Sequence, residues 1–134
     1  MMLPRNATVA VADGETLRLY RNGGDEARLH LTALPDPALE TVNAGSGARH
    51  HSSSANPDDS QVAEDSFAAA SAAWLNRRVL EGSIEALMVI AAPRTLGELR
   101  KHYRKELQAV LVGELSKDLA GHPVADVEHA VANA

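Results

Sequence analysis

Apolar and polar residues alternate with a period of two in the first part of the chain. Residues 8–12 are apolar and β-branched, while 16–21 and 27–34 place apolar side chains on one face. Turn residues separate these segments, with Asp13-Gly14 after the first and the Asn-Gly-Gly-Asp cluster at 22–25 after the second. Such clusters favour tight turns. The pattern therefore predicts an antiparallel meander of three strands.

The middle of the chain changes to helical spacing. Residues 61–80 contain no glycine or proline, and Phe67, Ala70 and Trp74 recur at helical intervals. Residues 84–91 are almost continuously apolar, which is typical of a central strand covered on both faces. These segments predict a helix that leads into a buried strand.

Two more helices and a strand follow in the pattern. Thr95 and Glu98 fit a capping box, which predicts a helix that starts at Thr95 and carries the basic segment 94–105. Residues 108–115 suit a strand or a helix, and their β-branched content favours a strand. Residues 123–131 place three valines on one side of a last helix.

This order of elements predicts an α/β domain with a ribonuclease H-like architecture. We expect three layers, with a mixed five-stranded sheet in the middle and helices on its faces. The helices lie there because right-handed crossovers connect the parallel strands. A length of 134 residues suits one domain over 1–134. Within it, the segment 35–60 is rich in proline, glycine and serine and predicts a long flexible loop.

Composition narrows the possible functions. The chain has no cysteine, which excludes disulfides and thiol catalysis, and its net charge of -5 argues against coating nucleic acid through overall charge. No signal peptide is visible and no apolar run approaches the roughly 18 residues of a membrane span. We therefore expect a cytoplasmic protein that does not associate with a membrane.

The sequence lacks a recognisable catalytic constellation. A metal-dependent nuclease needs several converging carboxylates, but the strand 84–91 leads into Ala92-Pro93 without an acid. Asp13 is placed more simply as a turn residue. No nucleotide-binding glycine fingerprint or nucleophile elbow is present. We expect a protein without enzymatic activity, cofactor or metal.

The predicted basic helix is the first candidate binding site. Arg94 and Thr95 lie at its start, and further cations follow at Arg100, Lys101, Arg104 and Lys105. A helix start with backbone N–H groups beside basic side chains suits a phosphate or ribosomal RNA. The simpler alternative is a solvated face whose charges pair with Glu98 and Glu106.

The predicted loop contains a second candidate at Arg49, His50 and His51. This polar segment gains positive charge at mildly acidic pH, and it could order on a partner. Adjacent histidines point in different directions, so a metal site is disfavoured. A plain linker is the alternative.

Five stretches resemble one bacterial family. These are 11–14 (Val-Ala-Asp-Gly), 74–77 (Trp-Leu-Asn-Arg), 92–100 (Ala-Pro-Arg-Thr-Leu-Gly-Glu-Leu-Arg), 113–119 and 122–124. The sequence resembles the bacterial host-attachment proteins, which are required for attachment to host cells. The resemblance implies kinship with the middle domain of eukaryotic release factors and Pelota, which is ribonuclease H-like. The Gly-Gly-Gln tip of release factors is absent, since Asp25 follows Gly23-Gly24.

Two functions are therefore expected from the sequence. One is a non-enzymatic protein required for host attachment. The other is a translation factor that contacts the ribosome or an RNA through the basic helix 94–105. The partner is RNA or a protein, and a homodimer could form at the open edge of the third strand.

Overall fold

Five strands and four helices make up the part of the chain that the computed structural model describes, residues 2–39 and 59–134. Their order along the chain is β1 (Thr8–Ala12), β2 (Leu17–Asn22), β3 (Leu31–Ala33), α2 (Asp59–Leu80), β4 (Leu87–Ala91), α3 (Pro93–Arg100), α4 (Lys105–Val110), β5 (Leu111–Ser116) and α5 (Val124–Ala132).

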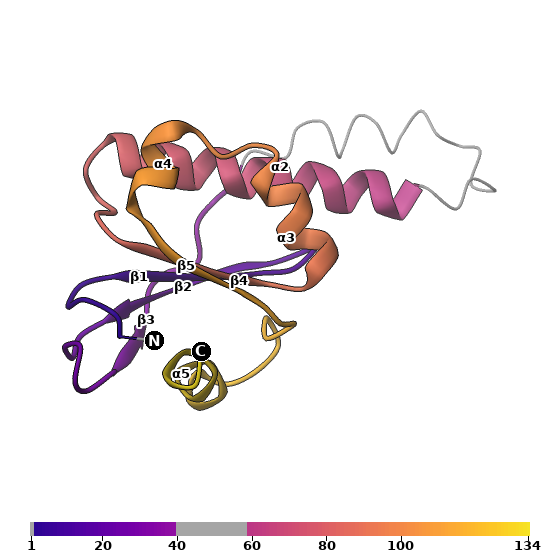
Figure 1. Ribbon diagram of the computed structural model, residues 1–134. Coiled ribbons are helices and arrows are strands. Elements are labelled where there is room, and N and C mark those ends of the chain that lie inside the picture. Colours follow the sequence, from indigo (N-terminus) through magenta and orange to yellow (C-terminus); the bar gives the residue numbers. More distant parts are fainter. Residues whose placement is uncertain (1, 40–58) are drawn as a thin grey trace.

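The strands form one mixed sheet with the order β3-β2-β1-β4-β5. β1 pairs antiparallel with β2, and β2 with β3, which confirms the predicted meander. β4 lies parallel to both β1 and β5. The predicted three-layer α/β fold is confirmed, because α2, α3 and α4 cover one face of this sheet and α5 covers the other (Figure 1).

Each face of the sheet has its own core, as the alternation along the strands requires. On the face covered by α2, α3 and α4, the strand residues Ala10, Leu87 and Val89 share a core with Leu99 of α3 and Leu107 of α4. Val9, Met88 and Ile90 belong to the other core, which α5 closes with Val127 and Val131. The alternating strands of the sequence thus become a sheet buried on both sides.

The predicted apolar stripe of helix α2 is buried only in part. Phe67, Ala70 and Trp74 are half-buried, whereas Leu75, which extends the stripe, is fully buried against the sheet together with Ala68 and Ala72. Small side chains let the helix backbone approach the strands closely, and the larger rings lie at the margins of this contact. Trp74 is therefore a margin residue of the core and remains partly accessible.

The predicted helix over 94–105 is wrong in its extent. α3 ends at Arg100, the next residues form a turn, and α4 begins at Lys105. The residues up to Val110 are helical, so the predicted strand over 108–115 starts only at Leu111. An extra short helix therefore precedes the last strand.

The capping box at Thr95 is also wrong. Ala92 is the N-cap of α3 and Pro93 is its first residue, and the helix start has no side-chain cap. Proline at this position lacks an N–H that would be unpaired anyway and has a preorganised φ angle. Glu98 instead accepts a hydrogen bond from Lys101 Nζ at 3.0 Å.

β3 is an edge strand of three residues, shorter than the predicted 27–34. Its Leu31 N–H donates to the Glu128 carboxylate of α5 at 2.8 Å. A side chain from the other end of the chain thus occupies a donor that an added strand would need. Pairing of two copies through β3 stays a prediction.

The predicted loop 35–60 is only partly visible. Residues 35–39 have no regular secondary structure, and Leu39 packs against the core beside α2, whereas Asp59 and Ser60 already belong to α2. Residues 40–58 lie outside the described part. Among the described helices, none is both long and apolar enough to cross a bilayer.

Candidate functional site

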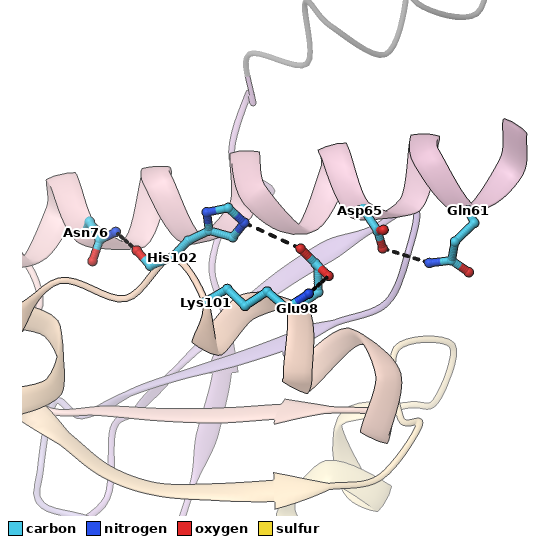
Figure 2. A network of polar contacts seen from close by, with 6 residues as sticks. All are labelled: Gln61, Asp65, Asn76, Glu98, Lys101 and His102. Carbon is cyan, nitrogen blue, oxygen red and sulfur yellow. Dashed lines mark hydrogen bonds and ion pairs between the residues drawn. The ribbon is translucent and has the colours of Figure 1, made fainter. Parts of the chain in front are cut away.

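Asn76 joins helix α2 to the turn between α3 and α4. Its side chain is buried, its Nδ2 donates to the backbone oxygen of His102 at 2.8 Å, and its Oδ1 accepts from the backbone N–H of Arg104 at 3.1 Å. Figure 2 shows the first of these bonds reaching from α2 to His102.

This contact explains why the predicted helix 94–105 is interrupted. In a continuous helix, the Arg104 N–H would donate four residues back to the carbonyl of Arg100. Asn76 instead accepts a hydrogen bond from the Arg104 N–H and donates one to the His102 carbonyl. Both backbone groups are therefore paired without helical geometry. Arg104 has an extended backbone (φ -88°, ψ 166°) and precedes α4.

The clamped turn forms one wall of a surface depression of about 410 Å³. The guanidinium-bearing residues Arg77 and Arg104 line it from α2 and from the turn, together with His102. The small residues Ala69 and Ala73 also line it. Two arginines from separate elements thus border a space large enough for a phosphate or a sugar-phosphate unit.

The predicted basic residues divide into paired and unpaired cations. Arg100 Nη2 contacts Glu114 at 2.8 Å, and Lys101 pairs with Glu98 at 3.0 Å. The hydrogen bond from Lys101 lowers the pKa of Glu98, and the bond to Glu114 raises the pKa of Arg100. The predicted pairing with Glu98 is therefore confirmed for Lys101, while Arg100 uses Glu114 on β5.

The other predicted cations keep their charge accessible. Arg94, Arg104 and Lys105 are exposed, and none has a carboxylate within ion-pair distance among residues 2–39 and 59–134. Arg94 and Thr95 lie at the start of α3 and do not line the depression. Of these predicted residues, Arg104 therefore belongs to the depression, whereas Arg94 and Thr95 do not.

Glu98 lies at the centre of a small polar network beside α2. Its second carboxylate oxygen lies 3.6 Å from His102 Nε2, an ion pair when the imidazole is protonated. Figure 2 shows Lys101 and His102 on either side of this carboxylate, and a separate bond of 2.7 Å between Gln61 and Asp65 on α2. Glu98 therefore offsets the charge of Lys101 and contacts His102, but it does not pair with Arg77 or Arg104.

Arg77 is the site residue that the sequence analysis misses. It stands in the Trp-Leu-Asn-Arg stretch, but its distance of 27 positions from Arg104 hides their convergence. The available signal is the adjacent Asn76, which with Ser71 is one of two polar residues that are buried on the described part of α2. A buried amide needs partners, and those partners identify the segment that packs there.

The remaining sequence candidates fall elsewhere. Arg49, His50 and His51 lie outside the described residues. Gly23-Gly24 is part of a compact turn, in which the Gly24 N–H donates to Asn22 Oδ1 at 3.0 Å. Asp13 is a turn residue as predicted, because its Oδ1 accepts from the N–H groups of Glu15 and Thr16. The described residues contain no group of acids and histidines arranged to hold a metal ion.

The comparison with protein families adds to this geometry. The model of bacterial archaeo-eukaryotic release factor family 12 matches residues 6–131. The chain belongs to this family. The matched range contains all described strands and almost all of α5, and it includes Asn76, Arg77 and Arg104. Among curated proteins, none matches the sequence.

Proposed function

We propose that the protein is a translation-associated factor that contacts ribosomal RNA through Arg77 and Arg104. Membership in a release-factor family supports a role near the ribosome. The observation that carries the RNA contact is that two exposed arginines from separate elements line one depression in a chain of net charge -5. Arginine binds phosphate oxygens in a planar, two-pronged geometry.

This proposal moves the contact away from the helix start. Arg100 and Lys101 are held by Glu114 and Glu98, so a phosphate would have to compete with a carboxylate for them. Arg104 faces no such competition among the described residues, and Asn76 holds its backbone in place. A preorganised cation loses less conformational freedom when it binds a phosphate.

Co-sedimentation with ribosomes tests the proposal. We expect the native protein to pellet with ribosomes at low salt and to be released as salt rises, because phosphate contacts release counterions. The double variant Arg77→Gln/Arg104→Gln should lose this association. The matched variant Arg100→Gln/Lys101→Gln removes the same charge from paired positions and should retain most of it. Equal binding by both variants contradicts the assignment.

The proposed role requires no chemistry from the protein itself. We propose that it acts by binding, without enzymatic activity, and in the cytoplasm, where ribosomes are found. A requirement in host attachment, which the sequence resemblance implies, stays a prediction. The family match concerns release factors and gives that requirement no support.

A further inference from the structure

The depression between Arg77 and Arg104 is the first of four that share lining residues. Arg77 and Ala73 also line a second depression of about 190 Å³ beside Trp74. Trp74 in turn lines a third of about 600 Å³. That depression shares Arg21 with a fourth of about 370 Å³, which Arg5 also lines. Each depression therefore adjoins the next at shared residues, and we call this series of four a path over the molecule.

The path is basic although the chain is acidic. Its lining includes the arginines 5, 21, 77, 78 and 104, and two acids, Asp36 and Glu85. The whole sequence has 13 lysines and arginines against 18 acids. We call this lining the arginine track. Only Arg78 among the five has an ion-pair partner in the described part of the chain, Glu81 at 3.2 Å.

Trp74 lies in the middle of the track, half-buried and covered by an arginine. The guanidinium carbon of Arg78 lies over the Trp74 ring, 4.9 Å from its centre, in a cation–π contact that leaves a surface of guanidinium and indole edge on the track. Unpaired nucleobases stack on aromatic rings and on arginine planes, and the basic groups on either side can contact the backbone phosphates. In a duplex the base faces are already stacked on one another and cannot use such a surface.

We infer that the arginine track binds single-stranded RNA, with the phosphates on the arginines and a base on the Trp74–Arg78 surface. This inference rests on the proposed function, because the track begins at the same pair, Arg77 and Arg104. The track extends the contact past the end of α2 to Arg5, which precedes β1, and to Arg21 near the end of β2. The occupant is thereby a strand several nucleotides long.

Fluorescence anisotropy of labelled oligouridylates tests the length of the site. We expect an oligomer of about 12 nucleotides to bind at least tenfold more tightly than one of about 4, because only the longer strand reaches the whole track. In the variant Arg5→Gln/Arg21→Gln, the affinity for the longer oligomer should fall to the affinity for the shorter one. The salt dependence should weaken by about 0.7 in log-log slope for each phosphate that the variant no longer binds.

Trp74 provides a direct readout of stacking because it is the only tryptophan in the sequence. We expect its fluorescence to be quenched by the oligouridylate and unchanged by polyphosphate, which has charge without bases. Arg94→Gln removes one exposed arginine outside the track and serves as the control, with binding within twofold of the wild type. A duplex RNA of equal length should bind more weakly.

Several results overturn the track. They are equal affinity for the two lengths, no effect of Arg5→Gln/Arg21→Gln, unchanged Trp74 fluorescence on binding, or equal binding of duplex RNA. If ribosome association is nevertheless lost in Arg77→Gln/Arg104→Gln, the proposed function stands without the track. If oligouridylates bind as expected and ribosomes do not, the track stands and the proposed ribosomal contact is rejected.

Discussion

The side chain of Asn76 accepts a hydrogen bond from the backbone N–H of Arg104 at 3.1 Å, across 28 residues of sequence. The same amide donates to the carbonyl of His102. One buried residue of α2 therefore holds the turn between the end of α3 and the start of α4. The stability of this region and its charge pattern depend on the same contact.

Removal of the Asn76 side-chain amide should destabilise the folded protein. Asn76→Ala leaves the Arg104 N–H and the His102 carbonyl without their partner in a partly buried place, so we expect a loss of about 2–4 kcal/mol in the free energy of unfolding. Urea denaturation measures it. Asn133→Ala removes an exposed amide near the C-terminus and should cost less than about 0.5 kcal/mol. Similar losses in both variants contradict a specific role for Asn76.

Two glycines should respond in opposite directions to alanine. A Cβ on Gly24 would lie 1.8 Å from the backbone oxygen of Arg28, so the turn must shift, and we expect a loss of about 1–3 kcal/mol. Gly97 lies inside α3 with open space around its Cβ position, and Gly97→Ala should gain about 0.5–1 kcal/mol. Thermal unfolding of the two variants provides the comparison. A stabilised Gly24→Ala protein would contradict the tight turn.

Tyr103 should make the protein sensitive to alkaline pH. Burial, and then the negative charge of Glu114, raise the pKa of its phenol above the usual 10.0. The unfolded chain therefore loses this proton at lower pH than the native protein does. The stabilising contribution is complete below a pH of about 10 and is lost as the pH rises toward the raised value.

The variant Tyr103→Phe isolates this effect. Urea denaturation at about pH 8 and about pH 11 should show a smaller loss of stability in the variant than in the wild type. At neutral pH we expect the two proteins to be similar, because the hydroxyl has no hydrogen-bond partner in the described part of the chain. Parallel losses in both proteins would mean that Tyr103 has an ordinary pKa.

Glu128 should protect the edge of the sheet. Glu128→Ala leaves the Leu31 N–H without its acceptor, so we expect faster hydrogen exchange at that amide and a loss of about 1 kcal/mol. Glu128→Gln keeps an acceptor oxygen and should retain most of the protection. Exchange rates measured by NMR distinguish the variants. Unchanged exchange at Leu31 in the alanine variant would show that the carboxylate does not hold the strand.

Much of the fold could be predicted because its signals are local. The alternation in 8–21 and the apolar run 84–91 reflect which faces of a strand are buried, and both are present in the sheet, whereas of the predicted strand 27–34 only 31–33 pair. The capping-box prediction failed because Pro93 starts the helix two residues before Thr95. The strand predicted over 108–115 failed at 108–110, which continue the helix whose Leu107 packs into the core.

The candidate site was predicted in part. The basic segment 94–105 contains Arg104, but its other cations either pair with acids or lie on a different surface. Helical spacing predicted the pair of Lys101 with Glu98, but it cannot indicate a carboxylate that lies on another element. Glu114 lies 14 residues from Arg100, and no local pattern indicates their contact.

The sequence by itself determined the α/β class, the meander, the buried central strand and the relationship to release factors, since each depends on residue type at short spacing. The tertiary structure alone decided that the helix 94–105 breaks, that Arg77 and Arg104 line one depression, and that Arg100 pairs with Glu114. At the break, the buried amide of Asn76 pairs with the backbone groups of His102 and Arg104 that packing brings to it, because a buried amide must have its hydrogen bonds satisfied.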